Sequence, residues 1–457
     1  MDRRTFLSTS FSLAAGVTLS SIVGCTPEGE RGERKAAREA VAQKNWAGNL
    51  EYRSQQLYQP TSISKAQEVV VQNDKLRPLG TRHCFNRIAD SRHAQISLRD
   101  LDQIDQIEEE AGTATIEAGA SYGQVCKTLD EHGFALQNLA SLPHVSIAGA
   151  VATATHGSGA NNSNMATAVS GLEFIDARGE LVSLTRENDG EDFNGAPVHL
   201  GGLGPITKVT LDLVASFDMR QHVYRDLPVS AMRTHFSEIM GSGYSVSLFT
   251  DYRDQTINQV WRKQKVESSS SKAEPDFFGA FPADQKMHPA GAAAAPCTDQ
   301  QGTPGPWYNR LPHFKMGFTP SSGEELQTEY FVPREHSVEA YDAIADLKEE
   351  IAPYLIISEI RLVEADDLWM STAYKHPKTT FHFTWKRDPE GVESVLPKIE
   401  EALRPFAVQP HWGKIFTLSP ETVKSRYARL DDFKDLLATY DPKGKFRNEY
   451  LQRYLYD

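Results

Sequence analysis

The sequence has few cysteines, no excess of positive charge and no motif typical of a metal site. Its 457 residues include four cysteines, Cys25, Cys84, Cys126 and Cys297, which are too few and too far apart for a disulfide scaffold. The formal net charge of −13 lacks the basic excess that a nucleic-acid partner favours. The 14 histidines are scattered without zinc-type Cys/His spacing, so we expect no metal and no nucleic-acid partner.

Two familiar phosphate-binding motifs are also missing from the glycine-rich segments 79–86 and 145–159. Neither segment is a G-x-G-x-x-G or a G-x-x-x-x-G-K-[ST], so a Rossmann fingerprint and a P-loop are both unsupported. Their small residues nevertheless let a ligand approach the backbone, whose N–H groups bind phosphate oxygens without lysine. The alternative is that both segments are ordinary tight turns.

With 40 % apolar residues, the chain is long enough for one large or two medium domains. Helix- and strand-like patterns predict an α+β domain over residues 45–217 and a second α+β domain, with a mixed or antiparallel sheet, over 218–405. Residues 406–457 form a C-terminal segment. A stretch rich in Pro, Gly, Ala and Ser, residues 267–307, predicts a long irregular excursion that is either functional or mobile.

The N-terminus is typical of an export signal. Arg3 and Arg4 form a twin-arginine pair before a mildly apolar run, and "IVGC" at residues 22–25 resembles a bacterial lipoprotein box. We therefore expect a signal peptide over residues 1–24, a lipid on Cys25 and a charged tether over 25–44, which places the protein in the periplasm or at the cell surface. The alternative is a signal anchor that stays in the membrane, although the run is short for a stable span.

Two strand-like segments of the second domain carry polar residues on one face. In "ISEIRLV", alternation places Glu359 and Arg361 together, and in "TTFHFTW" it places Thr380, His382 and Thr384 together. These residues are either an ion pair on a solvated sheet or the lining of a cavity. In a cavity, the carboxylate would accept hydrogen bonds from sugar hydroxyls and the guanidinium would donate them.

Several longer motifs carry a family resemblance. "LGTRHCFNRIAD", "NLASLPHVSIAGAVATATHGSG", "SVSLFTDYR", "PGPWYNRLPHFKMGFTPSSGEELQTEY" and "HWGKIF" resemble alditol oxidases, in the covalent-flavin family that includes vanillyl-alcohol oxidase and the sugar-lactone oxidases. The resemblance extends from "NWAGNL" to the C-terminus. It implies an N-terminal FAD-binding domain, a cap domain over the flavin and a C-terminal segment that returns to the flavin site.

The resemblance also implies site residues. It implies covalent FAD on His83, and it assigns Lys414 and Arg361 to catalysis. The substrate-binding set is Ser141, Glu359, Arg361, His382 and Thr384. The remaining cofactor-binding set is Gly80, Thr81, Arg82, Cys84, Phe85, Ser141, Ser146, Gly149, Thr153, Ala154, Thr155, His156, Ile206 and Lys414. Family members often have G-x-G-H-S around the histidine, whereas this chain has Arg82 for the glycine and Cys84 for the serine.

The activity that the resemblance implies is oxidation of the terminal CH–OH of a linear polyol, such as xylitol or sorbitol, to the aldehyde. Dioxygen would be reduced to hydrogen peroxide, and Lys414 would accept or polarise the hydroxyl proton. One alternative is a sugar-1,4-lactone oxidase or dehydrogenase that uses another electron acceptor. A second is a non-catalytic lipoprotein that binds a sugar or a flavin.

The export signal generates a first prediction. Cys25→Ala removes the lipid acceptor, so the variant should be released from membranes while the unmodified chain stays with them. Fractionation of cells that express each form measures this. A variant that stays membrane-bound would contradict the lipid-anchor interpretation.

Overall fold

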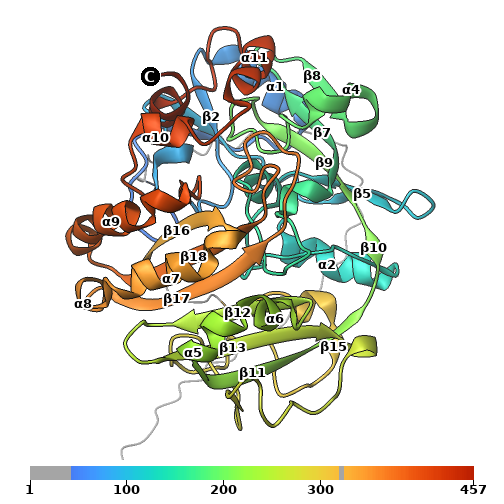
Figure 1. The fold of residues 1–457 in the computed structure, drawn as a ribbon. Helices are drawn as coiled ribbons and strands as arrows, with labels where there is room; N and C mark the ends of the chain where they lie inside the picture. Colours follow the sequence, from blue (N-terminus) through green and yellow to red (C-terminus); the bar gives the residue numbers. More distant parts are fainter. Residues whose placement is uncertain (1–42, 319–323) are drawn as a thin grey trace, which may run out of the picture. The chain divides into compact units, whose positions relative to one another are not determined.

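A computed structural model describes residues 43–318 and 324–457 of the chain (Figure 1). The predicted signal peptide, Cys25 and almost all of the predicted tether lie outside the described residues. The described residues belong to one unit, Ala42–Asp457. No helix in the described ranges is both long and apolar enough to cross a membrane.

The N-terminal region contains a small parallel sheet and a larger antiparallel one. The parallel sheet has the order β1-β3-β2, and the five-stranded sheet has the order β4-β5-β9-β7-β8. The strands are β1 (Gln56–Tyr58), β2 (Leu76–Pro78), β3 (Ala94–Ile96), β4 (Ile104–Glu108), β5 (Thr113–Glu117), β6 (Phe134–Ala135), β7 (Val169–Ile175), β8 (Leu181–Thr185), β9 (Ile206–Asp212) and β10 (Val214–Ala215). The helices are α1 (Ile63–Gln72), α2 (Tyr122–Glu131), α3 (Ile147–Ala152) and α4 (Arg186–Phe193).

Local sequence signals account for the first helices. At the start of α1, the Ser62 hydroxyl accepts a hydrogen bond from the Lys65 backbone N–H, which satisfies one of the free donors of the first turn. At the start of α2, Ser121 and Gln124 form a capping box. The hairpin of β7 and β8 turns at Gly179, whose φ of 86° is in the left-handed region that glycine adopts without strain.

The second region is built on a nine-stranded sheet whose ladders are all antiparallel. Its order is β14-β11-β13-β12-β17-β18-β16-β19, and β15 also pairs with β11. The strands are β11 (Asp218–Pro228), β12 (Ser245–Thr250), β13 (Thr256–Lys265), β14 (Phe281–Pro282), β15 (Gly305–Pro306), β16 (Glu325–Pro333), β17 (Leu355–Val363), β18 (Lys378–Lys386) and β19 (Gln409–Pro410). Its helices are α5 (Val229–Thr234), α6 (Phe236–Gly241), α7 (Ser337–Ala345), α8 (Lys348–Ile351) and α9 (Pro389–Leu403), and the C-terminal segment adds α10 (Pro420–Lys424), α11 (Leu430–Tyr440) and α12 (Glu449–Leu451).

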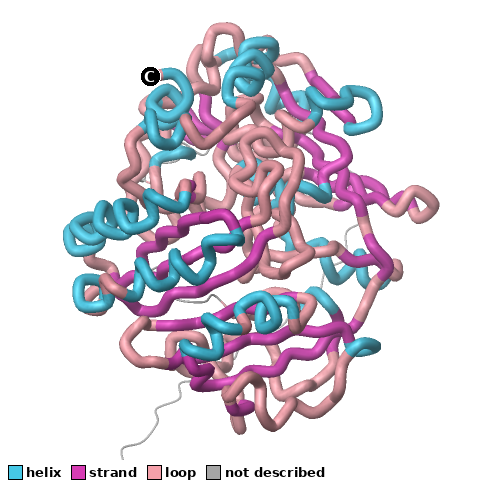
Figure 2. The backbone as a smooth tube through the Cα atoms, in the orientation of Figure 1, coloured by secondary structure: helices cyan, strands magenta, loops and turns pink. Residues whose placement is uncertain are grey.

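The two faces of this sheet differ in chemistry. One face contributes Ile360, Phe381 and Phe383 to a hydrophobic core that is completed by side chains of α5, α6, α7 and α9. The backbone of the strands and of the helices beside them can be followed in Figure 2. On the opposite face, the register aligns Glu359 of β17 with His382 of β18. The predicted alternation in both strands is therefore confirmed, and the sheet is antiparallel.

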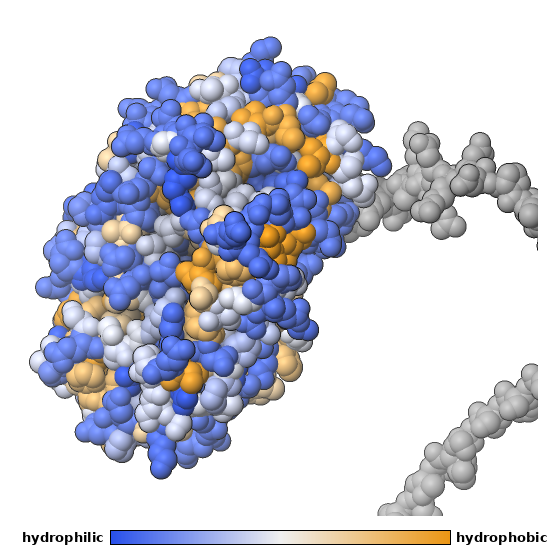
Figure 3. Space-filling model, turned by 90° about the vertical axis from the view of Figure 1, so that its right-hand side faces the viewer, coloured by the Kyte–Doolittle hydropathy of each residue, from blue (hydrophilic) through white to orange (hydrophobic). Residues whose placement is uncertain are grey.

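The chain passes from the first sheet to the second between β10 and β11, where the sequence predicts a boundary at residue 217. The irregular excursion that follows β13 is attached to the sheet, because β14 and β15 both pair with β11. On the face of the molecule in Figure 3, hydrophilic residues cover most of the surface and hydrophobic residues form scattered patches among them.

The C-terminal segment returns to the N-terminal region. β19 pairs with β16, and Trp412, Phe433 and Leu451 then pack in the N-terminal hydrophobic core. Buried Arg77 joins the parts that lie far apart in sequence, because its guanidinium donates to the backbone carbonyls of Ile88, Leu200, Gly201 and Phe446. This return places the loop after β19 beside the segment that carries His83.

Candidate active site

His83 lies in a loop that its neighbours hold in one conformation. Its Nδ1 is 3.2 Å from the Thr81 hydroxyl, and its ring stacks on Trp46 with a centroid separation of 5.1 Å. Burial, together with the positive charge of Lys414, lowers the pKa of His83 to about 4. The imidazole is therefore neutral at neutral pH, which is the form that has a nucleophilic lone pair.

Arg82 accounts for the departure from the family pattern in this loop. Its φ is 66°, in the left-handed region that favours glycine. The backbone therefore keeps the conformation that a glycine would adopt without strain, and the cost of a non-glycine residue there is about 1–2 kcal/mol. The Arg82 side chain is exposed, so its bulk meets no steric obstacle in the interior.

The two glycine-rich segments meet at Thr81 and Ser146. The Ser146 backbone N–H donates to the Thr81 hydroxyl at 3.2 Å, while the Ser146 hydroxyl is buried without a hydrogen-bond partner. A Cβ on Gly80 or on Gly149 would lie only 2.8 Å from that hydroxyl oxygen. An unpartnered buried hydroxyl between two glycines fits an oxygen-rich group such as the diphosphate of FAD.

The other predicted cofactor residues lie in or beside these segments. The Phe85 backbone N–H donates to the Gly413 carbonyl at 2.7 Å, and the Cys84 thiol is close to Gly413. The Thr153 hydroxyl donates to the Gly149 carbonyl and lies 3.2 Å from the Thr155 hydroxyl. Ala154 has a positive φ of 52°, and Ile206 begins β9 within the N-terminal core.

Arg361 lies between two buried carboxylates. Its Nη2 donates to Glu329 Oε1 at 2.6 Å, and its Nε is 3.6 Å from Glu359 Oε1. Its Nη1 also donates to the Ser141 hydroxyl at 3.4 Å, which connects the sheet to the N-terminal region. Glu359 and Arg361 are each 6 % exposed, so the alternative of an ion pair on a solvated sheet is wrong.

Lys414 and His382 complete this polar face. The Lys414 ammonium donates to the Gln327 side chain and lies 4.8 Å from the ring centroid of Phe85. His382 Nδ1 is 3.5 Å from Glu329, and its Nε2 is 3.4 Å from the Thr384 hydroxyl. The site thus contains hydrogen-bond donors, acceptors and one lysine within a largely buried face.

Burial and the charges of this face shift the pKa values of its carboxyl and ammonium groups. Although burial opposes it, the positive charge of Arg361 lowers the pKa of Glu329 and of Glu359 well below the usual range of a carboxyl group. Burial lowers the pKa of Lys414, and Glu329 opposes that shift. Both carboxylates therefore act only as hydrogen-bond acceptors at neutral pH, while the lysine loses its proton at a lower pH than an exposed lysine does.

The motifs considered in the sequence do not single out Glu329 and Gln327. Both lie on β16 and face the same way as His382 and Thr384, with which they are in register. His156, predicted as a cofactor residue, is 3.1 Å from Glu329 Oε1. The same two-residue alternation in "ELQTEYFV" would have identified both residues, once β16 is recognised as a strand.

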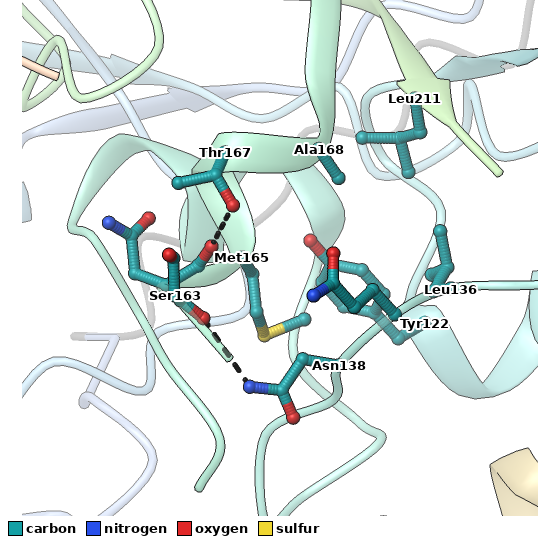
Figure 4. Close-up of a pocket in the computed structure, with 10 residues that line it drawn as sticks. Tyr122, Leu136, Asn138, Ser163, Met165, Thr167, Ala168 and Leu211 are labelled. Atoms are coloured by element: carbon teal, nitrogen blue, oxygen red, sulfur yellow. Dashed lines mark hydrogen bonds between the residues drawn. The ribbon is translucent and has the colours of Figure 1, made fainter. Parts of the chain in front are cut away.

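A separate pocket in the N-terminal region is lined by residues that include Asn138, Ser163 and Leu211 (Figure 4). Asn138 donates to the Ser163 carbonyl at 3.4 Å across it, and Met165 and Tyr122 line its wall. None of its lining residues is a predicted site residue.

Comparisons with known proteins agree with this arrangement. The profile of the FAD binding domain family matches residues 55–185, and that of D-arabinono-1,4-lactone oxidase matches residues 322–454. An alditol oxidase of Streptomyces sp. (strain IKD472 / FERM P-14339) is 41 % identical over 419 residues, 90 % of this chain and 99 % of that protein. An L-gulono-1,4-lactone dehydrogenase of Mycobacterium tuberculosis is 27 % identical over 430 residues, 90 % of this chain and 98 % of that protein. The crystal structure of cholesterol oxidase from B. sterolicum has a TM-score of 0.73 at 14 % identity and covers 90 % of this chain and 96 % of its own.

The fold and the matched cofactor domain define an FAD-dependent oxidoreductase with an N-terminal FAD-binding domain. At 41 % identity over nearly the whole of its relative, the chain belongs to the alditol oxidase family, among the vanillyl-alcohol oxidase flavoproteins. The predicted family and fold class are confirmed.

Three buried histidines of this structure generate a prediction about pH. Burial lowers the pKa of His199 and of His411 to about 3 and the pKa of His313 to about 4. In each ring, Nδ1 accepts a hydrogen bond, which only an unprotonated nitrogen does. The unfolded chain takes up these protons near pH 6.5, so the free energy of unfolding should fall from pH 7 to pH 5, by up to about 2 kcal/mol per histidine.

Chemical denaturation at pH 7, 6 and 5 measures this fall. His199→Asn retains a side-chain acceptor for the Gly201 N–H but has no titrating group. In this variant the free energy of unfolding should fall less between pH 7 and pH 5, by up to about 2 kcal/mol. A stability that is constant from pH 7 to 5 would contradict the neutral state of these rings.

Proposed function

We propose that the protein oxidises the terminal CH–OH of a linear polyol, such as xylitol or sorbitol, to the aldehyde while dioxygen is reduced to hydrogen peroxide. Membership of the alditol oxidase family supports this proposal. The observation that carries it is the buried polar face, on which Glu359, Arg361 and Ser141 together present acceptors and donors suited to hydroxyl groups.

Bound FAD would supply the two-electron acceptor for the hydride of the substrate carbon and would pass the electrons to dioxygen. Thr81, Ser146 and the glycines beside them would hold its diphosphate. We propose that His83 forms a covalent bond to the flavin, because its ring is neutral and is oriented by Thr81 and Trp46. The covalent bond would prevent loss of the cofactor.

The substrate hydroxyls would be bound by charge-assisted hydrogen bonds. Arg361 donates toward the Ser141 side of the site, Glu359 accepts, and the Thr384 hydroxyl does either. Lys414 would accept or polarise the hydroxyl proton as the C–H bond breaks. Its lowered pKa brings it closer to the neutral form that a general base requires.

A second candidate is oxidation of a sugar-1,4-lactone with another electron acceptor. The match of residues 322–454 to the profile of D-arabinono-1,4-lactone oxidase favours it, because this range contains most of the polar face. Anaerobic mixing of the holoenzyme with a panel of polyols and lactones, followed by oxygen, separates the two candidates. Bleaching by lactones alone would overturn the polyol proposal.

We also propose, from the sequence alone, that the protein is exported by the twin-arginine route and anchored by a lipid on Cys25. Export by that route suits a protein that binds its cofactor while it folds, before it crosses the membrane. The membrane would be involved only through that lipid.

The covalent bond generates a prediction for the cofactor. Acid precipitation of the wild type should leave yellow flavin on the polypeptide, and His83→Ala should abolish this because the attachment atom is gone. Flavin fluorescence of the protein band on a denaturing gel measures the bound flavin, and absorbance of the supernatant measures the released flavin. Flavin found entirely in the wild-type supernatant would contradict the covalent bond.

The polar face generates a prediction for catalysis. Glu359→Gln should weaken polyol binding, because a hydrogen bond to a carboxylate is worth about 1.5–3 kcal/mol, or roughly ten- to a hundredfold in kcat/KM. Lys414→Met should instead slow flavin reduction at saturating polyol, because it removes the group that takes the hydroxyl proton. Anaerobic reduction against polyol concentration distinguishes the two effects.

Glu364→Gln is a matched control, because Glu364 follows β17 and forms a partly exposed pair with Arg334 at 3.3 Å. It should change neither binding nor rate, since exposed ion pairs contribute little. Saturation and rate close to those of the wild type in both Glu359→Gln and Lys414→Met would remove these residues from the active site.

A further inference from the structure

A completely buried lysine lies behind the polar face. Lys263 of β13 is 0 % exposed, and its ammonium donates to the carbonyls of Leu311 and Pro312 and to His313 Nδ1, the last at 3.0 Å. An ammonium group has three N–H donors, so all of them are used. Lys263 therefore binds the segment at residues 311–313 to the sheet.

These contacts determine which nitrogen of His313 carries the proton. Since Nδ1 accepts from Lys263, the neutral ring has its proton on Nε2, which donates to Glu359 Oε1 at 2.7 Å. Phe249 and Trp261 pack edge-on against the ring, with centroids 5.6 Å and 5.1 Å away. His313 is 4 % exposed, so water does not compete for these contacts.

The same segment also reaches the other side of the site. The backbone N–H groups of His313 and Phe314 both point to the Ser141 carbonyl, at 3.1 Å and 3.3 Å. One short segment, residues 311–314, therefore contacts both Ser141 and Glu359, two of the residues assigned to substrate binding.

Only one oxygen of Glu359 is left for a ligand. Oε1 accepts from His313 and faces Arg361 Nε at 3.6 Å, whereas Oε2 has no hydrogen-bond partner among residues 43–318 and 324–457. A carboxylate oxygen in this position accepts a hydrogen bond but donates none, so it favours a hydroxyl group and disfavours a carbonyl oxygen.

We propose that Lys263 and His313 are positioning residues that hold Glu359 with Oε2 directed to a hydroxyl group of the substrate, so that this position selects an open-chain polyol hydroxyl over a carbonyl oxygen. This inference rests on the proposed polyol oxidation. It gives the segment at residues 311–314, which follows the irregular excursion, a role in specificity, because this segment supplies His313.

Two substitutions of His313 separate positioning from mere packing. His313→Gln places an amide N–H close to the former Nε2, so it keeps a donor for Glu359. His313→Asn places its amide close to the former Nδ1, so it keeps a partner for Lys263 but does not reach Glu359. We expect the polyol concentration for half-maximal flavin reduction to rise about tenfold in His313→Asn and much less in His313→Gln, with the limiting rate little changed in both.

The measurement uses the flavin-loaded enzyme with xylitol under anaerobic conditions at pH 6, below the pKa of about 7 to which burial lowers the Lys263 ammonium. Lys263→Met should also raise the half-saturating concentration, and Lys315→Met is its matched control because Lys315 forms a partly exposed pair with Asp299 at 2.8 Å. An equal rise of the half-saturating polyol concentration in His313→Asn and His313→Gln, or no rise in either, would overturn the proposal.

A second readout does not depend on turnover. In ¹⁵N spectra of the histidine-labelled enzyme, His313 should be protonated on Nε2 and unprotonated on Nδ1. The chemical shift of Nε2 should change in Glu359→Gln, because the charged acceptor becomes a neutral one. A proton on Nδ1 overturns the positioning inference even if polyols are oxidised. A wild type that no polyol reduces overturns the proposed function, while the tautomer still decides whether His313 donates to Glu359.

Discussion

The buried guanidinium of Arg361 is the charge on which the arrangement of the site depends. A buried charge without partners would cost several kcal/mol, and removal of one partner from a buried pair typically costs about 3–5 kcal/mol. Glu329 and Glu359 supply the opposite charge from β16 and β17. Since a shift of either strand by one residue would move its carboxylate to the apolar face, this charge balance and the hydrophobic core specify the same register.

The need of these buried charges for partners also joins the two regions of the protein. Ser141 and His156 come from the N-terminal region and contact Arg361 and Glu329 of the sheet. The C-terminal return adds Lys414, whose position is held by Asn86, which donates to the Lys414 backbone carbonyl at 2.7 Å. The site is therefore formed by segments that are distant in sequence, and buried polar contacts rather than one continuous motif keep them together.

Sequence patterns predict the parts of this site that are local. Alternation within β17 and β18 predicts that Glu359 and Arg361 share a face, and motif resemblance identifies the loop at His83. Lys263 of β13 instead comes close to Glu359 of β17 because β12 pairs with both strands, and β12 and β17 lie more than a hundred residues apart in sequence. Neither Lys263 nor His313 belongs to a local pattern with Glu359, so only the three-dimensional structure brings them together. At Arg82 the sequence is misleading in another way. The backbone there has the left-handed conformation that favours glycine, although the residue is an arginine.

The distribution of donors and acceptors connects this architecture to specificity. A sheet that buries carboxylates together with a guanidinium and a lysine presents both kinds of hydrogen-bonding group to a ligand, which suits hydroxyl groups because each of them donates and accepts. Because Glu359 Oε1 already accepts a hydrogen bond from His313, the other oxygen of this carboxylate discriminates by chemistry rather than by size. The fold alone does not make this choice, because an L-gulono-1,4-lactone dehydrogenase aligns with 90 % of the chain at 27 % identity; the side chains that surround the ligand make it.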